Sequence, residues 1–176
     1  PPCQCKSPEE IIEACKDADA IQVHFAEITR DILAALPKCR LLVHSGVGMD
    51  TIDVDAARDL GIPACNVPDY GIDEVSNMAI ALLLDCAKKL TYLASQVKQG
   101  NCSYTVVKPL YRMEGKTLGL VGFGRIPQAV AKKMAGFGLQ MLTYDPMVNE
   151  AAAKELGVTP VSLEELLERS DYVSVH

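Results

Sequence analysis

Two glycines and an aspartate in the second half of the chain have the types and spacing needed to bind a dinucleotide. Gly122 and Gly124 lie in a short turn that follows an apolar run and precedes a helix-like stretch. Gly122 allows the backbone to turn sharply, and the missing Cβ at Gly124 lets a diphosphate approach the chain. Asp145 follows the next apolar run, where its carboxylate can accept hydrogen bonds from both hydroxyls of a ribose. The pattern predicts a dinucleotide-binding turn.

The backbone at the start of the following helix is expected to hold the phosphates. The N–H groups of Arg125 and Ile126 would point at them along the positive end of the helix dipole. The carboxylate of Asp145 would repel a 2′-phosphate, so the predicted cofactor is NAD rather than NADP. The expected cofactor-binding residues around this turn are Gly122, Phe123, Gly124, Arg125, Ile126, Tyr144, Asp145 and Pro146.

One position departs from the dinucleotide-binding pattern, because Pro127 stands where a third glycine is usual. That glycine normally allows close packing of helix against strand, and proline is bulkier. Proline is nevertheless tolerated in the first turn of a helix, where its missing N–H has no partner to lose. We therefore expect the helix to form, with an effect of Pro127 on cofactor affinity. The alternative is a parallel αβ unit whose glycines serve only the turn.

The elements that position these residues alternate between strands and helices along most of the chain. This alternation predicts an α/β fold with parallel sheets. A capping box at Ser7 and Glu10 marks the first helix. The expected strands are Ala20–Phe25, Arg40–His44, Ile62–Val67, Thr117–Val121, Gln140–Tyr144, Val158–Val161 and Asp171–Val175, and the expected helices include Thr29–Leu36, Asp53–Leu60, a stretch ending at Gly138, and Asn149–Leu156.

A single long helix is expected from Asp73 to Gln99, because its apolar residues recur at steps of three and four. A helix of that length is unusual inside one small domain, so it is interpreted as a connector, followed by a loop at Gly100–Arg112. The predicted domains are residues 1–71 and residues 72–176. An ordinary core helix is the alternative interpretation.

Composition excludes several classes of function. The chain has 176 residues, 49% of them hydrophobic, and a formal net charge of -6, which does not favour a nucleic-acid partner. The longest apolar stretch, Met78–Leu84, is too short to cross a bilayer, and no cleavable signal sequence opens the chain. Seven scattered cysteines indicate reduced thiols and a cytoplasmic protein. Cys3 and Cys5 lack a second close pair, so no metal site is expected.

Five ordered segments of the chain together point to one family. The segments are DADAIQVHFAEIT, HSGVGMDTIDVDAARDLGIPACNVPDYG, DEVSNMAIALLLDCAKKL, GFGRI with Asp145, and LEELLERSDYVSVH. They resemble the D-2-hydroxyacid dehydrogenase family, which includes phosphoglycerate, glycerate and D-lactate dehydrogenases. The resemblance implies a Rossmann-type NAD-binding half-domain, a partial flavodoxin-like substrate domain and an active site between them.

Carried over by position, the resemblance gives roles to three further regions. Ser45, Gly46, Val47 and Gly48 would form the substrate loop, whose backbone N–H groups hold the carboxylate of a hydroxy or keto acid. A glycine-rich turn after a strand can present such an anion-binding nest, although a tight turn without a ligand is the alternative. Val75 would lie near the nicotinamide. His176 would open a loop that runs beside the adenosine.

Two histidines lie at predicted strand ends. His44 stands where many relatives carry an arginine that helps some of them bind an anionic substrate. A histidine is mostly neutral at pH 7, so a phosphorylated substrate is less favoured. His24 follows another strand and would face the expected cleft, although a half-buried structural histidine is the alternative.

The family's catalytic arginine, carboxylate and histidine would all lie beyond the segment matched by His176, so no catalytic residue is assigned in this chain. The first strand of the substrate domain is also missing, and the chain resembles the middle of a longer protein. The expected parent is an NAD-dependent oxidoreductase that interconverts a small D-2-hydroxy acid and its 2-keto acid. The alternative is a non-catalytic NAD-binding protein, like the corepressors that resemble this family.

The resemblance also implies motion and association. Hinge closure is expected around Pro68–Gly71 and near Gly100. A homodimer is expected through the NAD-binding domain and its long helix, and an aspartate at Leu82 or Leu83 should then break it.

Overall fold

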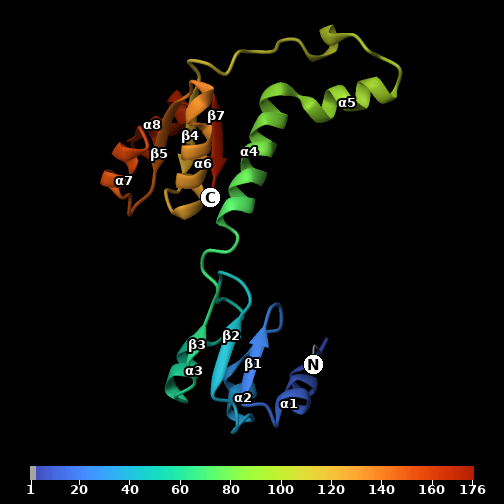
Figure 1. Cartoon of the computed structure of the whole chain (residues 1–176), viewed down its shortest axis with the longest axis vertical. Coiled ribbons are helices and arrows are strands. Elements are labelled where there is room, and N and C mark those ends of the chain that lie inside the picture. The colour runs from blue at the N-terminus through green and yellow to red at the C-terminus, as the bar shows by residue number, and fades with distance from the viewer. Residues whose placement is uncertain (1–2) are drawn as a thin grey trace. The chain divides into compact units, whose positions relative to one another are not determined.

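The computed structural model describes residues 3–176, which divide into two compact units, one ending at Tyr70 and the other running from Gly71 to His176. Each unit holds one parallel sheet, with the strand order β1-β2-β3 in the first and β6-β5-β4-β7 in the second (Figure 1). The predicted α/β class with parallel sheets is therefore confirmed. The functional names given to the predicted domains, 1–71 and 72–176, stay predictions.

The first unit places three short strands among three helices. Its core includes Leu42 and Ile32, whose side chains are almost completely buried. The third strand is shorter than the predicted Ile62–Val67, because β2 pairs with it only at two positions. The elements are α1 (Pro8–Cys15), β1 (Ala20–Val23), α2 (Arg30–Ala34), β2 (Leu41–His44), α3 (Val54–Asp59) and β3 (Ala64–Cys65).

All three helices of the first unit begin at a side-chain cap. Ser7, Thr29 and Asp53 each accept a hydrogen bond from a backbone N–H three residues later. In the predicted capping box, Glu10 reaches back to the N–H of Lys6 (2.7 Å) rather than to that of Ser7. These caps satisfy helix N–H groups that have no partner within the helix, which explains why short helices start at these points.

The second unit contains a four-stranded sheet whose two central strands have the predicted bounds. Its helix after the glycine turn continues as a 3₁₀ turn, Ala135–Phe137, and ends at Gly138 in a left-handed conformation. The strands are β4 (Thr117–Val121), β5 (Gln140–Tyr144), β6 (Val158–Pro160) and β7 (Tyr172–Val175), and the helices are α4 (Ile72–Lys88), α5 (Leu90–Lys98), α6 (Arg125–Met134), α7 (Glu150–Glu155) and α8 (Leu163–Arg169).

The single helix predicted over Asp73–Gln99 is wrong, because α4 ends at Lys88 and α5 begins at Leu90. Lys89 between them is left-handed (φ 54°), a conformation that breaks the helical hydrogen-bond series. Its Nζ donates to the carbonyl oxygens of Val107 (3.0 Å) and Pro109 (3.1 Å). Bonds to the following segment, which contains a 3₁₀ turn at Tyr104–Val107, therefore accompany the break.

The helix α4 belongs to the core of the second unit. It runs beside α6 (Figure 1), and its Leu83 joins a buried cluster with Val130 and Met134 of α6. On the other side of β4, Gly119 allows α8 to pack closely, since a Cβ built there would lie 2.5 Å from Leu166 Cδ2 and 2.3 Å from Ser170 Oγ. Within residues 3–176, no helix is both long and apolar enough to cross a membrane.

Candidate functional site

The carboxyl edge of the four-stranded sheet brings together most of the predicted cofactor-binding residues. Because all four strands are parallel, the segments that leave β4, β5 and β7 meet at this edge. Gly122 N–H donates to the carbonyl oxygen of Tyr144 (2.7 Å), and His176 N–H donates to that of Val121 (2.9 Å). Gly122 has φ 96°, and a Cβ built on it would lie 2.9 Å from the carbonyl oxygen of His176. Glycine is therefore required here for both backbone conformation and space.

Asp145 holds the glycine turn through two backbone hydrogen bonds. Its Oδ2 accepts the N–H of Phe123 (2.7 Å), and its Oδ1 accepts the N–H of Met147 (2.8 Å). These two backbone hydrogen bonds, to Met147 and then Phe123, lower the pKa of the Asp145 carboxyl below its ordinary value. The carboxylate is thus ionised near neutral pH, as recognition of ribose hydroxyls requires. Each oxygen keeps a second lone pair for a ligand.

The start of α6 fits a diphosphate. Gly124 is the N-cap of this helix and makes no side-chain capping bond. Apart from Gly124 itself and its two neighbours in the chain, no described residue has an atom within 4 Å of a Cβ built on Gly124, so space is open beside its backbone. An N-terminal helical turn with open space in front of it is a favourable place for phosphate oxygens.

Pro127 does not prevent the helix, as predicted. It occupies the third position of α6, and its ring is buried. The side chain of Gln128 donates through Nε2 to the carbonyl oxygen of Phe123 (2.8 Å), and its N–H donates to that of Gly124 (3.2 Å). The glycine turn is therefore bonded to the residue that follows the proline.

Three predicted cofactor residues are at least partly accessible. Val75 lies in the first turn of α4, with a side chain that is 49% exposed. Pro146 is exposed directly after Asp145. The ring of His176 contacts Ser174 Oγ through Nε2 (3.0 Å), and desolvation lowers the pKa of this histidine. The neutral imidazole is therefore favoured at this strand end.

In the first unit, the Ser45–Gly48 loop presents backbone donors. The carbonyl oxygen of Gly46 accepts the N–H of Val67 (3.0 Å), and that of Val47 accepts Nδ2 of Asn66 (2.6 Å). The N–H groups of Gly46, Val47 and Gly48 make no hydrogen bond to any described residue. A loop in which two carbonyls are bound and three successive N–H groups are available has the chemistry of an anion nest.

Two histidines pack beside this loop. Nε2 of His44 lies 2.9 Å from the carbonyl oxygen of His24, and a carbonyl only accepts, so Nε2 carries a proton. His44 is buried, and its Nδ1 has no hydrogen-bond partner in residues 3–176. Its ring lies against Gly46, where a built Cβ would come within 2.7 Å of Cε1. The buried ring of His44 therefore limits the space available to the loop at Gly46.

His24 is more exposed than His44 and is bonded to the loop directly. Its Nδ1 lies 2.8 Å from Ser45 Oγ, which also donates to the carbonyl oxygen of Val23 (3.1 Å). Because the single proton of that hydroxyl goes to Val23, Nδ1 of His24 is the donor to Ser45. The ring of Phe25 packs edge-on against His24, with 4.0 Å between ring centroids. His24 therefore ties the end of β1 to the start of the loop.

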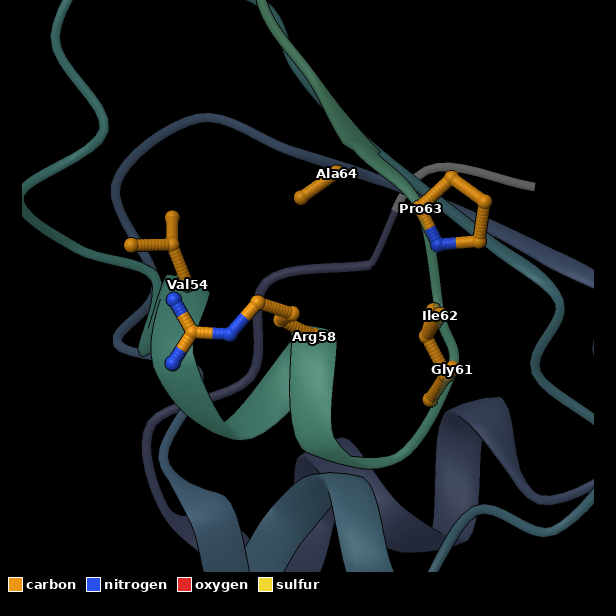
Figure 2. A pocket seen from close by; sticks show the side chains of 6 residues that line it. All are labelled: Val54, Arg58, Gly61, Ile62, Pro63 and Ala64. Carbon is orange, nitrogen blue, oxygen red and sulfur yellow. The ribbon is translucent and has the colours of Figure 1, made fainter.

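An open depression of about 340 Å³ lies elsewhere in the first unit, between α3 and the start of β3 (Figure 2). Its only charged lining residue is Arg58, whose guanidinium is paired with Asp55 (2.9 Å) and Asp59 (3.8 Å). No predicted site residue lines it. In the described chain, no group of three or more His, Cys, Asp or Glu side chains is placed to hold a metal ion.

Sequence reasoning missed the residues that support both glycine segments. Asn66 and Gln128 each donate from the side-chain amide to a carbonyl of one glycine segment. Asn66 lies inside the expected strand Ile62–Val67, so the sequence contained no signal for its bond to the loop. Gly119, inside an apolar strand, was a signal, since such a glycine marks close approach of another element.

Comparison with known proteins gives one family match. The family model described as D-isomer specific 2-hydroxyacid dehydrogenase, NAD binding domain, matches residues 80–176, which is more than half of the chain. D-3-phosphoglycerate dehydrogenase of Mycobacterium tuberculosis is 36% identical over 169 residues, covering 96% of this chain and 32% of that protein. Glyoxylate reductase of Korarchaeum cryptofilum is 38% identical over 174 residues, covering 97% of this chain and 52% of that protein.

A solved structure agrees with the fold. D-lactate dehydrogenase from Aquifex aeolicus, complexed with NAD and lactic acid, superposes with a TM-score of 0.84 at 32% identity, over 94% of this chain and 50% of that one. The similarity confirms the predicted fold, including its Rossmann-type NAD-binding part. The chain spans about a third to a half of the length of these relatives.

Proposed function

Because the chain belongs to the D-isomer specific 2-hydroxyacid dehydrogenase family, we propose that the protein is an NAD-dependent oxidoreductase that interconverts a small D-2-hydroxy acid and its 2-keto acid. NAD supplies the hydride acceptor in one direction and the donor in the other. The relatives are named as dehydrogenases and a reductase, so a non-catalytic corepressor is not favoured.

The main support for this proposal is the hydrogen bonding of the Ser45–Gly48 backbone. Two of its carbonyls are bound, and the N–H groups of Gly46, Val47 and Gly48 are available as three successive donors. In the proposed reaction these donors hold the substrate carboxylate, so that the neighbouring carbon is presented in a fixed orientation. The step requires no charged side chain, which suits an acid with a single negative charge.

The proposed cofactor contacts lie at the end of the other sheet. The diphosphate would contact the first turn of α6 beside Gly124, and the ionised Asp145 would accept the ribose hydroxyls. Val75, Tyr144, Pro146 and His176 are proposed as further contacts to the cofactor. A carboxylate at Asp145 favours NAD over NADP because a 2′-phosphate would be repelled.

We propose a small, unphosphorylated acid as the substrate. His44 is buried beside the loop, and its Nε2–H is already bound to the carbonyl oxygen of His24. The carboxylate of Asp50 also lies close to the loop, since its Oδ2 is 2.8 Å from a Cβ built on Gly48. A second negative charge on the substrate would be repelled by this carboxylate.

The test is oxidation of NADH by the full-length protein with a panel of 2-keto acids. The panel includes glyoxylate, pyruvate and hydroxypyruvate, with phosphohydroxypyruvate as the phosphorylated member. Turnover of the unphosphorylated acids with NADH, and slower turnover with NADPH, is the expected result. Absence of turnover with every acid would contradict the proposed activity, and fastest turnover of the phosphorylated acid would contradict the proposed substrate class.

A homodimer formed through α4 and α5 is proposed as well. Met78 and Leu82 of α4 and Leu90 of α5 have exposed fractions of 61%, 59% and 52%, and α5 has no buried residue. Exposed apolar side chains gathered on neighbouring helices are typical of an association surface. A substitution at Leu82 tests this proposed interface directly.

Leu82→Asp is expected to convert the dimer to a monomer in sedimentation velocity without unfolding it. Leu167→Asp, at a 56% exposed leucine of α8, is the matched control and should leave association unchanged. Leu83 is not suitable as a test, contrary to the expectation from sequence, because it is 9% exposed and part of the core. A Leu82→Asp protein that remains dimeric would contradict the proposed interface.

A further inference from the structure

The ammonium group of Lys133 is surrounded by oxygens from the beginning of another helix. Lys133 lies in the last turn of α6, and its Nζ donates to the Asp73 carbonyl oxygen (3.0 Å), Asp73 Oδ1 (2.6 Å), Ser76 Oγ (2.8 Å) and Asn77 Oδ1 (2.6 Å). An ammonium has three N–H donors, so these four oxygens more than saturate it. The end of α6 is therefore bonded to the start of α4.

The acceptors around Lys133 are also bonded to one another. Ser76 is completely buried, and its hydroxyl donates to the Asp73 carbonyl oxygen (2.8 Å) while accepting from Lys133. Nδ2 of Asn77 donates to Asp73 Oδ2 (3.3 Å). Hydrogen bonding to Lys133 lowers the pKa of the Asp73 carboxyl, which keeps it ionised. The contacts form one connected network rather than a single ion pair.

The network holds a helix start that has no side-chain cap of its own. Gly71 is the N-cap of α4 and has no side-chain capping bond. Asp73 in the first turn of α4 and Lys133 in the last turn of α6 each lie at the helix end that favours their charge. Since Asp73 is 73% exposed, the ion pair by itself contributes little stability. Its main effect is to fix the geometry of the first turn of α4.

The first turn of α4 also carries Val75, which is proposed to contact the cofactor. We propose that Lys133 is a positioning residue for cofactor binding, which holds Val75 in a fixed place relative to the phosphate-binding turn of α6. The inference rests on the proposed NAD function. Lys133 lies in the last turn of α6, at the opposite end from the proposed phosphate position.

The test compares three variants of the full-length protein by NADH fluorescence titration and by hydrogen exchange of the backbone amides of residues 73–77. Lys133→Met removes the ammonium and keeps the apolar stem. Lys133→Arg keeps the charge. Lys132→Met is the matched control, because the neighbouring Lys132 belongs to the same last turn and makes no hydrogen bond or ion pair with a described residue.

Lys133→Met is expected to raise the Kd for NADH about fivefold, because Val75 would no longer be held in place to contact the cofactor. The same variant is expected to speed hydrogen exchange at the backbone amides of residues 76 and 77. Lys133→Arg should recover part of the affinity, and Lys132→Met should change neither quantity. If Lys133→Met folds poorly, Asn77→Ala removes one acceptor more gently and should give a smaller rise in Kd.

Two outcomes would overturn the inference. Faster exchange in Lys133→Met with an unchanged Kd would mean that the network only stabilises the helix end. Equal effects of Lys132→Met and Lys133→Met on the Kd would mean that general charge matters rather than position. A wild-type protein that binds no NADH would instead contradict the proposed cofactor, and it would do so without any variant.

Discussion

The glycine turn after β4 and the glycine loop after β2 both leave a strand of a parallel sheet, but they are held in different ways. After β4 the chain enters α6 at once, and Asp145 holds the turn through the N–H of Phe123. After β2 the loop is held through its carbonyls by Asn66 and Val67. The first segment is fixed both by the exit of β5 and by its own helix, through Gln128, whereas the second is fixed by the exit of β3.

The difference changes what each glycine must do. Gly122 is required by a backbone conformation and Gly124 by open space, whereas Gly46 is required because a buried ring lies against it. The turn after β4 would receive an anion at a helix end, where the dipole is favourable. The loop after β2 has no helix end and would bind an anion only through its N–H groups. The direction of these N–H groups depends on how the loop packs. Substitutions should therefore damage folding at one segment and binding at the other.

The largest expected effect is on stability at the loop after β2. Gly46→Ala would place a Cβ 2.7 Å from Cε1 of His44, so the buried ring would have to move and lose its bond to His24. Overpacking of this kind costs about 1–3 kcal/mol. Urea unfolding of the full-length protein measures the loss.

Gly48→Ala is the matched control for the loop. Its new Cβ would meet only Oδ2 of Asp50, at 2.8 Å, which belongs to an exposed side chain that can rotate away. The expected loss is below about 0.5 kcal/mol. Equal destabilisation by the two alanines would show that the ring of His44 does not set the requirement for glycine.

An effect on binding with little effect on stability is expected at the turn after β4. Gly124→Ala would place its Cβ in open space, so unfolding should be unchanged, but the methyl group would occupy the phosphate position. We expect the Kd for NADH to rise about tenfold, which corresponds to ~1.4 kcal/mol. Gly136→Ala, also in open space but beyond α6, is the control. An unchanged Kd in Gly124→Ala would contradict the phosphate position.

A smaller effect is expected from Asp145→Asn. Backbone hydrogen bonds lower the pKa of this carboxyl from 3.8, so its ionised form stabilises the folded turn above the ordinary pKa. That contribution is lost as pH falls through the lowered value. Asp145→Asn should therefore weaken the dependence of unfolding on pH below about 4. It should also reduce the preference for NADH over NADPH in a fluorescence titration. An unchanged preference would contradict the role proposed for Asp145.

The turn after β4 could be predicted from sequence because its parts are close together in the chain. The apolar runs, the two glycines and Asp145 all lie within one βαβ unit, and β4 and β5 have the predicted bounds. The glycines of the loop after β2 were visible, but its support was not. His24 and Asn66 directly follow β1 and β3, and only the folded sheet brings their side chains to the loop.

The break between α4 and α5 shows a second limit of sequence reasoning. The apolar period continues across Lys89, and lysine is ordinarily compatible with a helix. Lys89 is left-handed in a context that includes bonds from its Nζ to Val107 and Pro109. Asp85 then accepts the N–H of Thr91 (2.7 Å) and satisfies a donor at the start of α5. The two bonds of Lys89 join residues that are 18 and 20 positions apart, so no local sequence pattern predicts them.

Gly119 restricts how the centre of the second sheet can vary among descendants of this sequence. A methyl group there would overlap Leu166 and Ser170 of the adjacent α8 segment, so a single replacement is penalised whichever side chain is chosen. A larger residue at position 119 becomes acceptable only after the overlaps with both position 166 and position 170 have been relieved. The order of substitutions is therefore constrained, and a randomised library at position 119 alone should return glycine.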